Sequence, residues 1–178
     1  KAVNVLLPII KQSQIMAQKY DIIITNPPYM GAGGMSGKLS EYVKSKYPDS
    51  KSDMYAIFIE KCGEMLKKNA YQAMITQHSW MFLSSFETLR QNMMRKDIVS
   101  MAHLGPRAFE EIGGEVVQTT AFVIGNRKVK LYKGTYTRLV EPTTQKGKED
   151  LFLKTVANHD CRFFFTANSE NFSVIPGA

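Results

Sequence analysis

The chain of 178 residues has few of the side chains that build metal centres or disulfide frameworks. Its two cysteines, Cys62 and Cys161, stand far apart, and its three histidines are scattered, so no metal-binding spacing is present. Two isolated cysteines are typical of a reduced, cytosolic protein. No apolar run is long enough to cross a membrane and no signal peptide opens the chain, so we expect a cytoplasmic protein with no membrane partner.

An initiator methionine is also missing, since the chain opens on Lys1 inside an apolar pattern. We therefore expect a fragment of a longer protein. Hydrophobic residues make up 44% of the chain, enough for the core of one domain. The formal net charge of +7 favours an acidic partner such as nucleic acid or an anionic membrane, and a solvated basic surface without a partner is the alternative.

Short β-branched runs predict the strands of a sheet. The run "YDIIIT", Tyr20–Thr25, is continuous and is soon followed by proline, which is typical of a strand buried on both faces. An apolar pattern that Pro8 interrupts predicts a helix before this strand. Further strands are expected at 71–76, 98–105 and 116–126, and residues 128–139 fit either another strand or a hairpin partner.

Apolar residues at helical spacing predict two helices between these strands. The first begins at a cap on Ser52 or Asp53 and ends near 67–69, and the second covers 86–96. This alternation predicts an α/β fold with a mostly parallel sheet. The loop before 116–126 is too short for a helical crossover, so that final strand is expected to be antiparallel. The chain turns polar after Pro142, which indicates a boundary followed by a linker.

The most informative stretch is "TNPPYMGAGGMSGK", which follows the first predicted strand. Two successive prolines fix the backbone and remove two N–H donors, so the turn is stiff and leaves carbonyl oxygens free. Asn26 adds a side-chain acceptor, and Tyr29 offers a ring on which a flat group can stack. The turn therefore suits a planar group with an exocyclic amine, bound at the carboxyl end of a strand where ligands of open α/β sheets bind.

Two acceptors aimed at such an amine have a chemical consequence. They draw both N–H bonds out of the ring plane, which makes the nitrogen lone pair available for attack. They also stabilise the positive charge that develops on nitrogen, so they bind the transition state better than the ground state. A plain structural turn is the competing interpretation of Asn26-Pro27-Pro28-Tyr29. The glycines that follow do not form a Walker A loop, because Ala32 and Leu39 occupy two of its required positions.

Three segments in order resemble one enzyme family. "DIIITNPPY" resembles motif IV of the amino-group DNA methyltransferases, in the form found in N6-adenine enzymes. "SDMYAIFIEKCGEMLKKNAYQAMITQHSWMF" resembles motifs V and VI, and "HLGPRAFEEIGGEVVQTTAFVIGN" resembles motifs VII and VIII. The spacing and "SWMFLSSFETLR" look most like the BREX phage-defence methyltransferases, also called PglX. The resemblance covers about the first four-fifths of the chain.

This resemblance implies a fold, a reaction and a set of residues. The fold would be part of the Rossmann-like fold of S-adenosylmethionine-dependent methyltransferases. Residues 1–142 would be the carboxyl-side part of the catalytic core, and 143–178 a linker and the start of a target-recognition region. The reaction would move a methyl group from S-adenosylmethionine to N6 of an adenine flipped out of double-stranded DNA. The residue roles implied are amine binding by Asn26 and Pro27, shaping of the turn by Pro28, base stacking by Tyr29 and Phe109, and cofactor contact by Phe58 and Asp53.

The family's glycine-rich cofactor turn would precede Lys1, so we expect this chain alone to be inactive. Its missing first strands would expose a sheet edge to a second copy, and other phage-defence subunits are further candidate partners. The motif is equally suited to cytosine N4 or to protein glutamine, because each presents a planar amine. A non-catalytic DNA-binding or assembly module with a vestigial site is the last alternative. Outside the motif, Trp80 is expected in the core, and His78 is expected to be a hydrogen-bonded structural residue.

Overall fold

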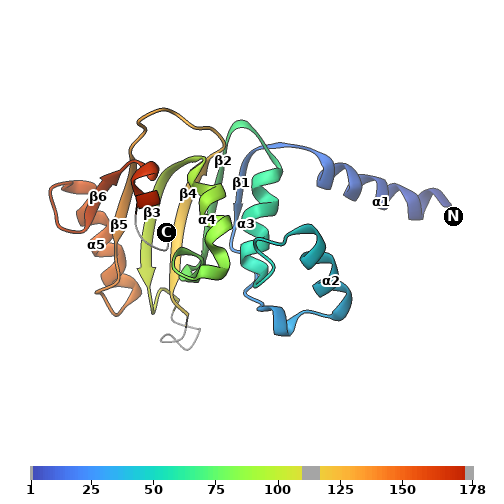
Figure 1. Cartoon of the computed structure of the whole chain (residues 1–178), viewed down its shortest axis with the longest axis horizontal. Coiled ribbons are helices and arrows are strands. Elements are labelled where there is room, and N and C mark those ends of the chain that lie inside the picture. The colour runs from blue at the N-terminus through green and yellow to red at the C-terminus, as the bar shows by residue number, and fades with distance from the viewer. Residues whose placement is uncertain (1, 110–116, 175–178) are drawn as a thin grey trace.

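The computed structural model describes residues 2–109 and 117–174. Within them the chain alternates helices and strands, with four short 3-10 helices (η), of which η1, η2 and η3 lie in connections and η4 follows the last strand (Figure 1). In chain order the elements are α1 (Ala2–Ala17), β1 (Tyr20–Thr25), η1 (Ala32–Gly34), α2 (Gly37–Lys46), α3 (Met54–Glu64), β2 (Leu66–Gln77), η2 (His78–Met81), η3 (Ser84–Phe86), α4 (Glu87–Met94), β3 (Asp97–Gly105), β4 (Thr119–Gly125), β5 (Gly134–Arg138), α5 (Gln145–Ala157), β6 (Phe164–Ala167) and η4 (Ser169–Val174).

One sheet of six strands has the order β1-β2-β4-β3-β5-β6. Strands β1, β2, β3 and β5 point the same way, and β4 and β6 run against them. The predicted α/β class, the mostly parallel sheet and the antiparallel β4 are confirmed. Two strands follow β4, so it is not the last one. Residues 134–138 are a further strand beside β3 and not a hairpin partner of β4, because β4 is already paired on both sides.

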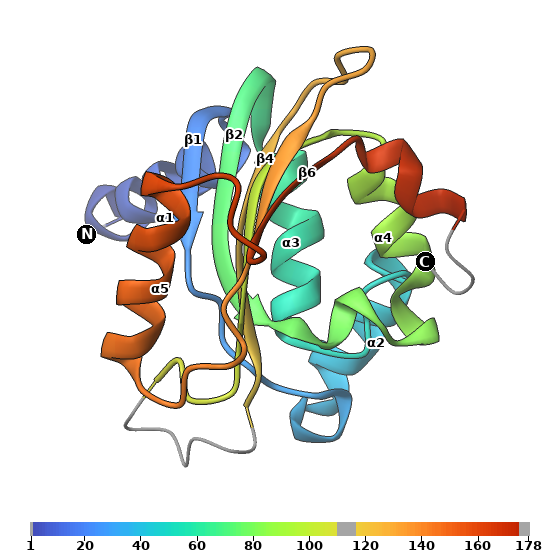
Figure 2. The same ribbon diagram turned by 90° about the vertical axis from the view of Figure 1, so that its left-hand side faces the viewer.

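Helices cover the two faces of the sheet unequally. Figure 2 shows α2, α3 and α4 on one side and α5 on the other, and Figure 1 shows α1 projecting away from the sheet beyond β1. The main core lies under α3 and α4 and contains Tyr55, Ile59, Trp80, Phe86 and Phe122 among its buried residues. The Trp80 indole donates to Thr76 Oγ1 at 3.1 Å, so its one polar atom is satisfied. The predicted core position of Trp80 is confirmed.

Two segments differ from the prediction. The helix expected to end near 67–69 is α3, which ends at Glu64, because Leu66 already pairs with Tyr20 as the first residue of β2. The glycine-rich segment, for which no helix was predicted, holds η1 and leads into α2. Ser36 caps α2, and Val43 anchors that helix against α3 in a small second core.

The expectation that β1 is buried on both faces is wrong. Ile22 is 60% exposed and Ile24 is 75% exposed, because β1 is the outer strand of the sheet and pairs only with β2. A β-branched run therefore predicted the strand correctly but not its surroundings. Helix α1 also leaves its apolar side chains exposed, and it continues through Pro8, which was expected to interrupt it.

The segment expected to be a linker after Pro142 is instead regular structure. Thr144 Oγ1 accepts from Gly147 N at 3.0 Å and so caps α5. The later strand β6 pairs antiparallel with β5 and extends the same sheet. Assignment of 143–178 to the start of a target-recognition region stays a prediction.

None of the helices within 2–109 and 117–174 is both long enough and apolar enough to span a membrane. In the same residues, histidine, cysteine, aspartate and glutamate form no group of three that could hold a metal ion.

Candidate functional site

The Asn26-Pro27-Pro28-Tyr29 turn lies at the carboxyl end of β1. The carboxyl ends of β2 and β3 and the start of β4 share this edge of the sheet, as the register of the strands requires. Pro27 is buried, Asn26 and Pro28 are exposed, and Tyr29 is half-buried. The backbone of the turn is thus anchored in the fold while its amide side chain faces outward, which is the arrangement that a ligand-binding turn needs.

Asn26 borders a hollow of about 700 Å³ on the α5 side of the sheet. The walls are mostly apolar and include Ile75 and Val123 from the sheet and Phe152 from α5. A flat, largely apolar group fits such walls, with Asn26 available to bind a polar atom at its rim.

Tyr29 packs inward against the core under α3. Its ring meets the Tyr55 ring edge-on, with centroids 6.0 Å apart and an interplanar angle of 83°. The Tyr29 hydroxyl is buried and has no hydrogen-bond partner among the described residues. Burial raises the pKa of Tyr29, and the nearby Asp53 charge raises it further. The phenol is therefore neutral at pH 7 and can donate a hydrogen bond, but it cannot act as a base.

Asp53 ties the turn to α3. Its Oδ1 accepts from Met30 N at 3.0 Å, directly after the turn, and from Tyr55 N at 3.3 Å in the first turn of the helix. The backbone adds a bond from Met54 N to Met30 O at 3.0 Å, and Gly31 forms a β-bridge with Asp53. The predicted helix cap at Asp53 is confirmed, and the cofactor contact implied for Asp53 stays a prediction.

The two predicted phenylalanines have different surroundings. Phe58 is half-buried against the core under α3 and α4. Phe109 lines a second hollow of about 820 Å³, which α5 shares with the end of β3. Asn26 and Tyr29 do not line that hollow, although Ala102 and Phe152 border both hollows. Among the described residues, then, Phe109 and Asn26 line two different hollows, which share Ala102 and Phe152.

A histidine pair occupies the same edge of the sheet. His78 Nδ1 and His103 Nε2 are 2.9 Å apart, and the Phe82 ring packs against both imidazoles. Burial lowers the pKa of His78, and it lowers the pKa of His103 to about 4 with help from the positive charges of His78, Arg138 and Lys148. The expected structural role of His78 is consistent with this bond. Sequence analysis missed its partner, because the inserted strand β4 separates their two strands.

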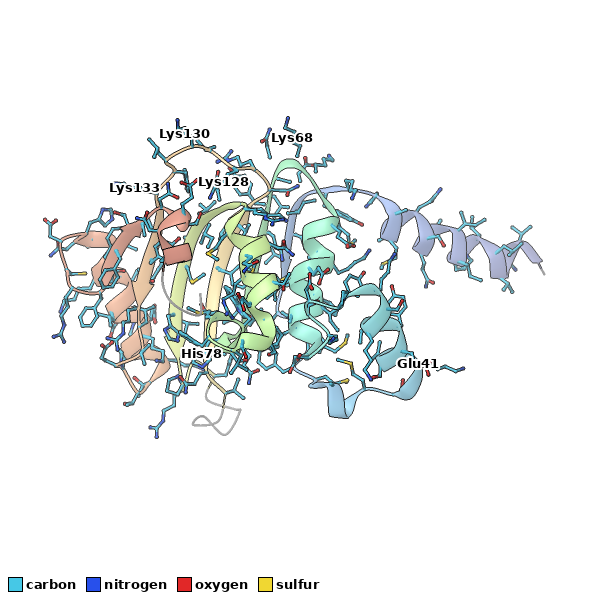
Figure 3. All side chains as sticks on the ribbon, viewed as in Figure 1. Glu41, Lys68, His78, Lys128, Lys130 and Lys133 are labelled. Carbon is cyan, nitrogen blue, oxygen red and sulfur yellow. The ribbon has the colours of Figure 1, made fainter. Side chains whose placement is uncertain are left out.

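The basic residues are divided between the two ends of the sheet. Figure 3 places His78 at the lower end and Lys68, Lys128, Lys130 and Lys133 at the upper end. The turn follows β1 at the lower end, beside α2 (Figure 1). The first lysines that follow it along the chain are those of α2, Lys38, Lys44 and Lys46, all exposed.

Comparison with known proteins decides the family. Residues 6–109, more than half of the chain, match the Eco57I restriction-modification methylase. The chain belongs to this family. It is 49% identical over 170 residues to an adenine-specific methyltransferase PglX of Lacticaseibacillus casei (strain Zhang), and 44% identical over 174 residues to an adenine-specific methyltransferase BrxX of Escherichia coli O9:H4 (strain HS). These alignments cover 96% and 97% of the chain but 14% of each relative.

Solved structures agree on the fold of this methylase-family chain. A type I restriction-modification assembly matches with a TM-score of 0.66 at 16% identity, covering 90% of this chain and 37% of that one. A class I S-adenosylmethionine-dependent methyltransferase from Listeria monocytogenes matches with a TM-score of 0.55 at 13% identity, covering 80% and 43%. The fold is therefore part of the Rossmann-like methyltransferase fold, as predicted.

Membership of a methylase family implies S-adenosylmethionine as the methyl donor. The residues at the turn suit a ligand of this kind. The buried Tyr29 hydroxyl lacks a partner, so an arriving polar atom could satisfy it, and the half-buried Phe58 lies on the helix that begins at Asp53. A ligand carrying both a flat aromatic group and hydrogen-bonding atoms would fit these groups.

Proposed function

We propose that this chain is the carboxyl-side part of the catalytic core of a DNA methyltransferase that modifies N6 of adenine. The observation that carries the proposal is the Asn26-Pro27-Pro28-Tyr29 turn, anchored by buried Pro27 at the carboxyl end of β1 in a chain of the Eco57I methylase family. The full protein would serve a restriction or phage-defence system, which is supported by the restriction-modification methylase family of the chain and by its resemblance to the BREX methyltransferases.

The proposed chemistry needs hydrogen-bond acceptors for the amine and the correct placement of the amine beside the methyl group. Bound S-adenosylmethionine supplies an electrophilic methyl group, and we assign Phe58 and Asp53 to its surroundings. Asn26 Oδ1 and the Pro27 carbonyl oxygen each accept a hydrogen bond from one N–H of the amine. These bonds expose the lone pair of the amine nitrogen and stabilise the positive charge that develops on that nitrogen. Pro28 keeps the turn stiff, so the acceptors need little rearrangement. None of these residues has to act as a strong base, because the proton can leave to water after attack.

The proposed substrate is double-stranded DNA with the target adenine outside the helix. Tyr29 would support one face of the base and Phe109 the other. The exposed lysines of α2, at the same end of the sheet as the turn, would neutralise phosphates. The unpaired edge of β1 and the exposed apolar residues of α1 would contact either the rest of the full-length protein or a second copy. Further subunits of the defence system are also candidate partners.

The full-length parent protein provides the test. It would be expressed, with any system partners it requires, in a bacterial host that lacks adenine methylation, and the genome sequenced by a method that reads N6-methyladenine directly. Asn26→Ala is the matched control. Methylation of one sequence motif that disappears in the variant supports the proposal. Its absence, with soluble protein and partners present, would point to cytosine N4, to protein glutamine or to a vestigial module.

A further inference from the structure

Tyr55 packs edge-on against Tyr29, on the core side of its ring. It is 0% exposed and stands at the start of α3, where helical spacing points it into the core. Its ring has aromatic neighbours in two directions, with the Tyr29 centroid 6.0 Å away and the Phe86 centroid 5.9 Å away. Edge-on aromatic contacts fix the angle between two rings as well as their separation. The orientation of the Tyr29 ring is thus set against a side chain that is itself fully enclosed.

The Tyr55 hydroxyl is also held in place, by a hydrogen bond with Ser79. Tyr55 Oη and Ser79 Oγ are 2.8 Å apart, and Ser79 Oγ donates to Gln77 Oε1 at 3.1 Å. A serine hydroxyl has one hydrogen, and since that hydrogen goes to Gln77, Tyr55 must be the donor in the first bond. A short chain of hydrogen bonds therefore joins α3 to the end of β2 and the η2 segment that follows it.

The same stretch of α3 also holds the main chain beyond the turn. Asp53, two residues before Tyr55, accepts from Met30 N, and Met30 follows Tyr29. Tyr29 is thereby restrained twice, through its ring by Tyr55 and through its backbone by Asp53. A ring restrained in this way keeps its remaining surface in a constant orientation, which is what a stacking platform for a base requires.

We propose that Tyr55 is the positioning residue of the methyl-transfer site, holding Tyr29 at the angle at which the flipped adenine stacks. This inference rests on the proposed function, in which Tyr29 contacts the base. Tyr55 itself touches neither base nor cofactor; it acts through Tyr29. Since a displacement of about 1 Å at a reacting group can lower a rate about 100-fold, loss of this support should appear in catalysis more than in DNA affinity.

The test compares three variants of the full-length enzyme with the wild type. Tyr55→Leu removes the ring, Tyr55→Phe keeps the ring without the hydroxyl, and Leu89→Ala opens a cavity in the same core at a residue of α4 that is not part of the Tyr29–Tyr55–Ser79 contacts. For each, kcat, the KM for DNA and the thermal midpoint are measured, together with the fluorescence of a duplex carrying 2-aminopurine at the target adenine, which reports base flipping.

We expect Tyr55→Leu to lower kcat at least about tenfold, with KM changed less than about threefold and a changed flipping signal. Tyr55→Phe should restore most of kcat. Leu89→Ala should lose thermal stability to a similar extent and keep kcat within about threefold of the wild type. Full kcat in Tyr55→Leu, or an equal loss of kcat in Leu89→Ala, would overturn the inference.

A second set of variants keeps the inference testable if Tyr55→Leu does not fold. Ser79→Ala leaves the Tyr55 hydroxyl buried without its acceptor, so the ring should shift and kcat should fall about threefold or more. Combining Ser79→Ala with Tyr55→Phe should recover kcat, because no unpaired hydroxyl remains. Additive losses in the double variant would contradict the proposal. A wild-type enzyme that methylates no adenine would instead overturn the proposed function, and this inference with it.

Discussion

Asp53 Oδ1 accepts hydrogen bonds from both Met30 N and Tyr55 N, so one carboxylate joins the end of the Asn-Pro-Pro-Tyr turn to the start of α3. Both bonds use an oxygen that an amide side chain also has. The two roles open to Asp53, a structural clamp and a charged cofactor contact, can therefore be separated by removing the charge while keeping the oxygen.

Asp53→Asn should leave the free energy of unfolding within about 0.5 kcal/mol of the wild type, because asparagine caps helices about as well as aspartate. Asp53→Ala should lower it by about 1–2 kcal/mol, measured by urea denaturation of the same protein. If the cofactor contact also exists, Asp53→Asn raises the KM for S-adenosylmethionine while stability holds. An unchanged KM in a stable Asp53→Asn enzyme would leave only the structural role.

Asn26→Ala should separate activity from stability. The side chain is exposed at the end of a strand, so its loss should change the free energy of unfolding by less than about 0.5 kcal/mol. Loss of one acceptor from the amine should lower kcat of the full-length enzyme about 100- to 1,000-fold. Single-turnover methylation of a duplex that carries the recognised site measures this effect directly. Near-normal turnover would show that Asn26 does not activate the amine.

The local sequence was sufficient to predict most helices and strands but not which residues pack against them. A β-branched run before two prolines predicted β1 correctly, yet burial depends on what lies beside the strand, and there Ile24 is exposed. Helical spacing likewise pointed Tyr55 into the core. Its contact with Tyr29 depends on the path that the chain takes between 31 and 53, which no periodicity encodes. The whole of α2 was missed for the same reason, since its anchor is the packing of Val43 on α3.

The Asn26-Pro27-Pro28-Tyr29 turn was the most predictable part of the candidate site, because two prolines define its backbone without help from distant residues. Pairs that meet across the sheet were the least predictable. His78 and His103 are brought together by β4, which lies between their two strands: His103 pairs with Thr120 of β4, and His78, just after β2, donates its backbone N–H to Gln118 O. The position of Phe109 beside α5 depended on a helix in a segment that was expected to be a linker.

Gly134→Ala should destabilise the fold strongly. A Cβ at Gly134 would lie 2.0 Å from the backbone oxygen of Ile98, and a backbone atom of the adjacent strand cannot move aside without disturbing the sheet. We expect a loss of about 3 kcal/mol in the free energy of unfolding. Gly37→Ala is the matched control, since a Cβ there meets nothing within 4 Å and alanine favours the helix that begins at this residue. Equal midpoints in urea for the two variants would contradict this packing.

The histidine pair predicts a pH dependence of stability. The pKa of His103 falls from 6.5 to about 4 on folding, chiefly through burial. Between these values the unfolded chain binds a proton that the folded chain does not, so stability should be constant above about pH 6.5 and fall progressively toward pH 4. The lowered pKa of His78 acts in the same direction.

Thermal midpoints measured from pH 7.5 to pH 4.5 would test this, with His103→Gln as the comparison. Glutamine can still bond to His78 but does not titrate, so the variant should lose less stability than the wild type as the pH falls through this window. Parallel curves for the two proteins would mean that His103 is protonated equally easily in the folded and unfolded chains. In that case its hydrogen bond with His78 and the packing of Phe82 would not exclude water from the pair.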